Sequence, residues 1–204
     1  MNKKIIKDAV MLTLITLIAG LLLGLVYEIS KTPIEQQKLL TKQKAFQAVF
    51  ENAVEFKEDE SIDLSKAPEV LAQAGYEEES IEEIVEALDS SGSVLGYVMN
   101  VTTSEGYGGD ITFTLGIQMD GTVNSYEILS ISETAGLGMK AKESDFKSQF
   151  DNKNVESFQY TKTGASAENE IDAISGATIT TNAITNGVNA GIVFFNSIKE
   201  GGNK

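Results

Sequence analysis

The sequence contains no cysteine, histidine, tryptophan or arginine, and all 16 of its basic residues are lysine. Without Cys and His, the chain cannot form a disulfide framework, a zinc finger, a cysteine-ligated iron–sulfur cluster, a His- or Cys-ligated haem or a Ser-His-Asp triad. The lack of thiols leaves the redox compartment open. Any chemistry on this chain therefore depends on hydroxyls, carboxylates, lysines or a bound cofactor.

The balance of charge is strongly negative. The chain has 30 acidic residues and a formal net charge of −14, and residues 51–89 hold much of the excess. This charge disfavours nucleic acid as a partner, because the phosphates would be repelled. The acidic segment fits either a solvated face that keeps the protein soluble or a docking surface for a basic partner.

An uncharged apolar run covers residues 9–26. A helix of this length measures about 27 Å, close to the roughly 30 Å of a bilayer's hydrocarbon core. The run therefore predicts a transmembrane helix over residues 9–27, in contact with the lipid bilayer. A cleaved signal peptide is the alternative, since three lysines precede the run, but no small-x-small cleavage site follows it. A lipoprotein cleavage is excluded because there is no Cys to acylate.

The predicted anchor divides the chain. Residues 1–8 form a short tail with three lysines, which we expect in the cytoplasm, with the large acidic part outside it. Lysines also follow the apolar run, so this orientation depends on the short tail and the acidic domain. We assign residues 28–80 to a membrane-proximal helix and acidic segment, 81–200 to the main domain and 201–204 to a C-terminal tail.

Hydrophobic periodicity predicts strands in the first half of the main domain. Residues 81–89 and 94–101 flank the turn sequence SSGS and predict a hairpin, although 81–88 also fits a helix by spacing. Residues 111–117 alternate and are followed by Asp120-Gly121, a strong turn signal, and then by 122–132. These two runs predict an antiparallel pair.

The remaining periodic segments predict helices around the strands. Residues 34–50 fit an amphipathic helix, and 142–150 fit a short helix with Ser144 as N-cap. Residues 155–163 predict a further strand with Val155, Phe158 and Tyr160 inward. A last amphipathic helix starts at Asn182, with inward positions at Ile184, Val188, Ile192, Phe195 and Ile198. The expected fold class is α+β, with an antiparallel sheet and flanking helices.

The segment 172–181, DAISGATITT, is the best candidate for chemistry. It places several hydroxyls and one glycine just before the predicted last helix. Free backbone N–H groups and the positive end of the helix dipole favour a phosphate at such a place. The alternative is a Ser/Thr-rich helix cap that needs no ligand.

Asp172, followed three residues later by Ser175-Gly176-Ala177-Thr178, resembles the motif of the FMN-binding domain found in the RnfG family, the G subunits of Rnf complexes, and in the C subunit of the sodium-pumping NADH:quinone oxidoreductase. Two further segments follow the family's order. Residues 106–111, GYGGDI, resemble its glycine-rich GYGG segment, and 133–138, ETAGLG, resemble its ETPGLG loop. Ala135 stands where Pro is usual, which frees φ there but removes no ligand. The resemblance covers essentially the whole chain and favours the RnfG family, because the quinone-reductase relative is usually longer.

The resemblance implies that residues 81–200 are an FMN-binding domain and that FMN is joined by a phosphoester to Thr178. It also implies that a separate flavin transferase recognises Asp172 and attaches the FMN. The chemistry of the chain supports a separate enzyme, because no His or Cys is present to activate the Thr178 hydroxyl. Plain charge complementarity at the helix start is the alternative role for Asp172.

The other residues predicted to bind the cofactor lie in the same two segments. Gly176 leaves room for a phosphate, Leu137 can pack on the flavin ring, Thr134 can donate a hydrogen bond and Lys140 can neutralise the phosphate. The alternatives are a simple turn former for Gly176, a core residue for Leu137 and a plain surface lysine for Lys140. The complete predicted set is Thr178, Ser175, Gly176, Ala177, Thr134, Gly136, Leu137, Gly138 and Lys140.

The function that this resemblance implies is a membrane-anchored electron-transfer subunit with covalent FMN, in an ion-translocating ferredoxin:NAD oxidoreductase with the other Rnf subunits as partners. The chain has no dinucleotide fingerprint and no cluster ligands, so it would catalyse no complete reaction alone. The alternatives are the C subunit of a sodium-translocating NADH:quinone oxidoreductase, a stand-alone anchored extracytoplasmic flavoprotein, and a flavin-free scaffold module.

Overall fold

The computed structural model describes residues 3–59 and 61–201, and the chain divides into two compact units at Thr41 and Lys42. Helix α1 (Lys3–Val49) makes up the described part of the first unit and continues into the second. Its apolar side chains before residue 27, such as Leu21 and Leu23, are exposed to the surroundings. Among the described residues, α1 alone is long and apolar enough to cross a membrane, which is consistent with the predicted anchor. The predicted tail at 201–204 lies, apart from Gly201, outside the described residues.

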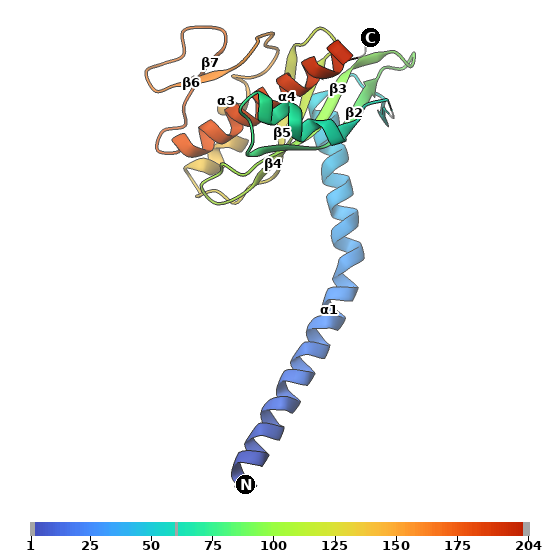
Figure 1. Ribbon diagram of the computed structural model, residues 1–204, viewed down its shortest axis with the longest axis vertical. Coiled ribbons are helices and arrows are strands. Elements are labelled where there is room, and N and C mark those ends of the chain that lie inside the picture. Colours follow the sequence, from blue (N-terminus) through green and yellow to red (C-terminus); the bar gives the residue numbers. More distant parts are fainter. Residues whose placement is uncertain (1–2, 60, 202–204) are drawn as a thin grey trace. The chain divides into compact units, whose positions relative to one another are not determined.

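The second unit contains a five-stranded antiparallel sheet in the order β1-β2-β3-β4-β5 (Figure 1). Its strands are β1 (Glu55–Glu58), β2 (Glu79–Leu88), β3 (Val94–Thr103), β4 (Ile111–Gln118) and β5 (Val123–Ser130). The predicted hairpin and antiparallel pair are confirmed. The helical alternative for 81–88 is wrong, because β2 is a strand covered on both faces, which buries the successive residues Ile84 and Val85.

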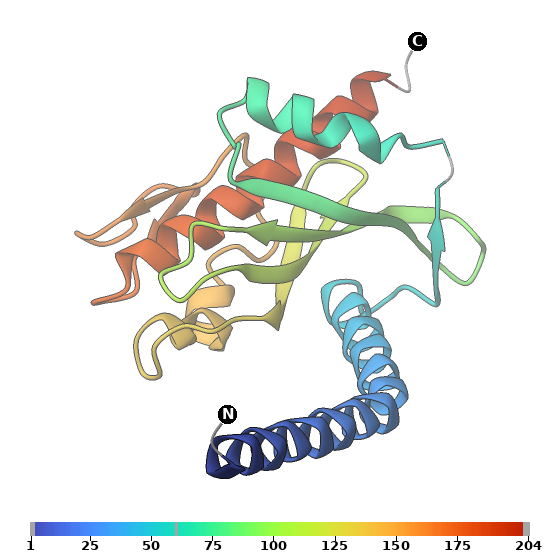
Figure 2. The same cartoon turned by 60° about the horizontal axis from the view of Figure 1, so that its bottom comes forward.

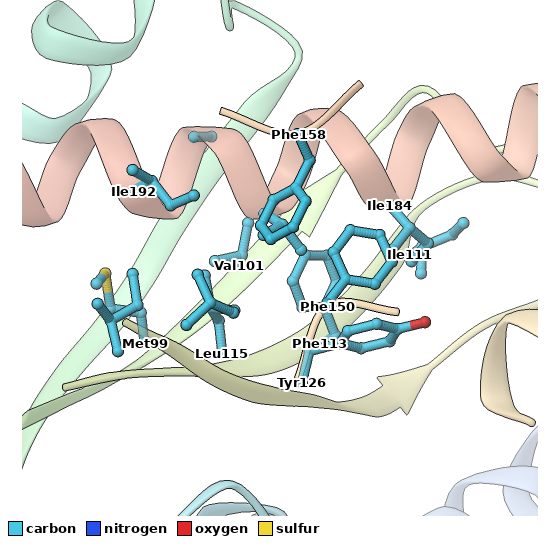
Figure 3. Packing of buried hydrophobic residues seen from close by; sticks show 14 of the residues in the cluster. Met99, Val101, Ile111, Phe113, Leu115, Tyr126, Phe150, Phe158, Ile184 and Ile192 are labelled. Carbon is cyan, nitrogen blue, oxygen red and sulfur yellow. The ribbon is translucent and has the colours of Figure 1, made fainter. Parts of the chain in front are cut away.

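Helices cover both faces of this sheet. Helix α4 (Thr178–Gly201) lies across one face beside α2 (Ala67–Gln73), as Figure 2 shows. Between α4 and the sheet, Phe113 and Leu115 of β4 pack with side chains such as Ile184 (Figure 3). On the opposite face, the last turns of α1 bury Phe46 and Val49 against β2 and β3. The predicted α+β class is therefore confirmed.

The chain between β5 and α4 contains only short elements. They are the 3₁₀ helix η2 (Gly138–Lys142), α3 (Ser144–Lys147), and β6 (Gln159–Thr161), which pairs in parallel with β7 (Glu170–Asp172). A further 3₁₀ helix, η1 (Leu64–Lys66), precedes α2. The predicted short helix over 142–150 and the predicted strand over 155–163 are present but shorter, since α3 ends at Lys147 and β6 covers only Gln159–Thr161.

The early end of α3 has a local reason. From residue 149 to residue 151 the backbone hydrogen bonds span only three residues, as in the Phe150 N–H, which donates to the Lys147 carbonyl at 3.0 Å, so the α-helix does not continue. Phe158, just before β6, packs on Phe150 with ring centroids 5.0 Å apart. Ser144 is the first residue of α3 and not its N-cap, which is Glu143. Helix α4 begins four residues before Asn182, because the Thr181 N–H already donates to the Ala177 carbonyl at 3.0 Å.

Candidate functional site

A cleft of about 490 Å³ brings together the three segments that the motifs single out. The glycine-rich segment contributes Tyr107. The ETAGLG loop contributes Glu133, Thr134, Leu137 and Gly138, and the start of α4 contributes Gly176, Ala177, Thr178, Ile179 and Thr180. Lining residues from different segments are 26 to 73 positions apart in sequence, so their convergence is a property of the fold. The volume lies in the range of small-molecule sites, about 300–1,000 Å³.

The start of α4 directs backbone donors toward this cleft. The first helical residues, Thr178, Ile179 and Thr180, have no backbone hydrogen-bond acceptor within the described part of the chain, as is usual in a first helical turn. Gly176 precedes the helix with φ +77°, a conformation that a residue with a side chain rarely adopts. The Thr178 side chain is half-buried at the cleft wall. This turn can therefore bind an anionic group beside a reachable hydroxyl.

The ETAGLG loop forms the opposite wall of the cleft. Its turn is closed by the N–H groups of Leu137 and Met139, which both donate to the Thr134 carbonyl, at 3.1 and 3.2 Å. A Cβ on Gly138 would lie 2.5 Å from Thr180 Oγ1, so this position requires glycine for the loop to approach α4. Leu137 remains 40% exposed at the rim. An apolar wall of this kind suits a flat ring system.

Of the residues predicted to bind the cofactor, six line the cleft: Thr134, Leu137, Gly138, Gly176, Ala177 and Thr178. Ser175, Gly136 and Lys140 are exposed and lie outside the lining. Asp172 also lies outside it. Its Oδ1 accepts a hydrogen bond of 2.6 Å from the Ala165 N–H, which gives the carboxylate a local structural contact.

Four lining residues were missed as individual site residues: Tyr107, Glu133, Ile179 and Thr180. Tyr107 and Glu133 stand inside the motifs, and their proximity depends on the loop geometry. Tyr107 is 72% and Ile179 52% exposed, so both offer free apolar surface at the cleft. An exposed aromatic beside two glycines was the signal available for Tyr107, whereas no pattern distinguishes Ile179 from a core residue.

Carboxylates also lie beside α4 next to the glycine-rich segment. Glu105 Oε2 accepts hydrogen bonds from Asn182 and Asn186 of α4, at 3.0 and 2.7 Å, and so ties that segment to the helix. Glu79 is buried, and Thr103 Oγ1 donates to it at 3.2 Å. Burial, assisted by the negative charge of Glu105, raises the pKa of Glu79 to about 7.

Comparison with known proteins defines the class of this domain. The family described as the FMN-binding domain matches residues 106–193, a range that contains every segment lining the cleft. A second family, described as the RnfG N-terminal region, matches residues 1–49 and so covers α1. The protein thus combines an FMN-binding domain with an N-terminal apolar helix.

The chain belongs to the RnfG family. It is 31% identical over 202 residues to the G subunit of the Na(+)-translocating ferredoxin:NAD(+) oxidoreductase complex of Acetobacterium woodii, covering 97% of this chain and 95% of that protein. It is 30% identical to the G subunit of the proton-translocating ferredoxin:NAD(+) oxidoreductase complex of Clostridium ljungdahlii, covering 87% and 84%. The crystal structure of Shewanella oneidensis NqrC superposes on 57% of this chain and 60% of its own, with a TM-score of 0.49 and 20% identity.

Proposed function

We propose that this protein is a membrane-anchored electron-transfer subunit of an ion-translocating ferredoxin:NAD oxidoreductase, and that it carries FMN covalently attached through a phosphoester to Thr178. The observation that carries the proposal is the cleft at the start of α4, where a reachable Thr178 hydroxyl stands beside free N–H groups. Relatives whose names state this activity match nearly the whole chain.

The residues of the cleft fit FMN. The first turn of α4 would hold the phosphate through its N–H groups and its helix dipole. Tyr107, Leu137 and Ile179 offer exposed apolar surface for the isoalloxazine ring. No lysine lines the described cleft, so in this proposal the N–H groups of α4 bind the phosphate of FMN. A phosphodiester-like link suits them, because it lowers the phosphate charge from nearly −2 to about −1.

The bound flavin would supply reversible electron uptake and release, while the protein supplies position and electrostatic surroundings. Attachment would need a flavin transferase, because the chain lacks a base that could activate Thr178. In this proposal the transferase recognises Asp172, whose side chain is exposed. Helix α1 would anchor the domain outside the cytoplasm, with the N-terminus inside, and the partners would be the membrane and peripheral subunits of the same complex.

Fluorescence in a denaturing gel tests the attachment. The full-length protein, produced together with a flavin transferase, should give a fluorescent band that is lost in Thr178→Ala. Ser132→Ala is a matched control, because it removes an exposed hydroxyl next to the same loop but outside the cleft lining. It should keep the band. A dark wild-type band, or a Thr178→Ala band as bright as the wild type, would contradict the proposal.

Co-purification tests the assignment to a complex. A member of a complex should be recovered from detergent extracts together with several polytopic membrane proteins, whereas a stand-alone anchored flavoprotein should be recovered alone. Loss of the partners with retained fluorescence would overturn the complex and leave the flavin site intact.

A further inference from the structure

Glu133 is a buried carboxylate inside the cleft, and none of the predicted roles uses it. Its side chain lines the cleft although the residue is only 8% exposed. Glu133 Oε1 accepts a hydrogen bond of 3.1 Å from the Gly108 N–H, which belongs to the glycine-rich segment. The carboxylate therefore joins two of the three segments that form the cleft.

Two glycines leave the space that this carboxylate occupies. A Cβ on Gly106 would lie 3.1 Å from Glu133 Oε1, and a Cβ on Gly138 would lie 2.6 Å from Glu133 Oε2. The side chain is thus enclosed from both sides and fixed in position. Gly138 has a physical reason here, because it gives room to Glu133, whereas at Gly106 the nearer obstacle to a Cβ is the Gly109 carbonyl at 2.2 Å.

No cation balances Glu133 among the residues that line the described cleft. The ion pairs of the described residues, Lys42 with Glu83 and Lys147 with Glu127, use other side chains. A fixed negative charge in a partly buried site raises the free energy of any further negative charge that enters it. It therefore disfavours a phosphate placed directly beside the carboxylate.

We propose that Glu133 is a positioning residue of the cleft: its carboxylate holds the glycine-rich segment in place, and its charge lowers the reduction potential of the flavin bound there. The second part rests on the proposed function, because it requires FMN in the cleft. Each electron that the flavin takes up brings negative charge toward Glu133, so the carboxylate stabilises the oxidised state relative to the reduced one.

Glu133→Gln separates the charge from the hydrogen bond. The amide oxygen of Gln can still accept from the Gly108 N–H, but the negative charge is gone. We expect one FMN per chain, as in the wild type, and a midpoint potential shifted to more positive values. Glu156→Gln removes one exposed charge outside the cleft lining and should leave the potential unchanged. Equal potentials in Glu133→Gln and the wild type would overturn the charge effect.

Hydrogen exchange tests the positioning without any flavin. In full-length protein carrying Thr178→Ala, the amide of Gly108 should exchange about tenfold faster when Glu133→Ala is added, because its acceptor is lost. Addition of Glu133→Gln should restore slow exchange. Unchanged exchange in the Ala variant would overturn the positioning role. A wild-type protein without FMN would contradict the proposed function and the charge effect, while this exchange measurement would still decide the positioning role.

Discussion

The sheet and the segments that line the cleft differ in the length of their elements and in the side chains that they contribute. Strands β2 to β5 pair over long registers, and large apolar side chains such as Phe113 and Leu115 are completely buried against α4. The chain from residue 131 to 177 has elements of at most five residues. It contributes two glycines, a buried acid and an exposed leucine to the cleft. The difference teaches that apolar burial stabilises the scaffold, whereas close backbone approach shapes the site.

Local polar contacts add to the few buried apolar side chains, such as Phe150 and Ile171, that hold the irregular segment. Glu170 Oε2 accepts from the N–H groups of Ser166 and Ala167 at 2.7 and 3.1 Å. Gln149 Oε1 accepts from the Asp172 N–H at 2.6 Å and so connects the turn after α3 to β7. Each such bond contributes only about 1 kcal/mol, so the segment depends on many of them together.

Truncation of the core gives the largest expected effect on stability. Phe113→Ala empties a fully buried position whose ring packs on Tyr126 with centroids 5.5 Å apart. We expect a loss of about 3–5 kcal/mol in the free energy of unfolding, measured by denaturant titration. Tyr107→Ala, at a 72% exposed position of the cleft, should change stability by less than about 0.5 kcal/mol. Equal losses in the two variants would contradict the division between scaffold and site.

Crowding of the cleft should give a smaller loss of stability and a larger loss of cofactor. In Gly138→Ala the new Cβ would meet Thr180 Oγ1 at 2.5 Å and Glu133 Oε2 at 2.6 Å. We expect a cost of about 1–3 kcal/mol together with reduced FMN incorporation per folded chain. Gly24→Ala, where no atom lies within 4 Å of the new Cβ, is the matched control. Normal FMN content in Gly138→Ala would show that the loop tolerates a wider approach to α4.

The smallest expected effect is a pH dependence at the border between sheet and site. The pKa of Glu79 is raised from 4.5 to about 7 in the folded protein, so its stabilising contribution is complete below 4.5 and is lost as the pH rises through 7. We expect the wild type to lose about 1–2 kcal/mol between pH 5 and 8 relative to Glu79→Gln, in denaturant titrations across that range. The free energy of unfolding of Glu156→Gln should change with pH in the same way as that of the wild type. If the curves of unfolding free energy against pH are parallel for Glu79→Gln and the wild type, the pKa of Glu79 is not raised by folding.

The scaffold could be predicted because its physics is local and repetitive. Alternation in 111–117 and the Asp120-Gly121 turn signal placed β4 and β5 almost to the residue. The spacing from Ile184 to Phe195 identified α4, although its first turn was missed. That turn lacks the apolar period, since Thr178, Ile179 and Thr180 line the cleft and the buried Thr181 is a hydroxyl residue.

The cleft could be predicted only as three separate motifs. Their convergence depends on the tertiary fold, which brings Glu105 after β3 and η2 after β5 into contact with α4, and no short-range pattern encodes it. Glu133 illustrates the limit, because its position depends on Gly138 in its own loop and on the N–H of Gly108 in the glycine-rich segment. The helix predicted over 142–150 ends early, at Lys147, because the following backbone hydrogen bonds close three-residue turns that the apolar spacing does not distinguish from an α-helix.

Mass spectrometry of the peptide around Thr178 tests the central claim most directly. Trypsin should release residues 163–199 from the full-length protein produced with a flavin transferase, since Lys162 and Lys199 bound this stretch without a lysine between them. We predict that this peptide carries one FMN, less the water lost in forming the phosphoester, and that fragmentation places it on Thr178. An unmodified peptide, or FMN on any other residue, would contradict the account.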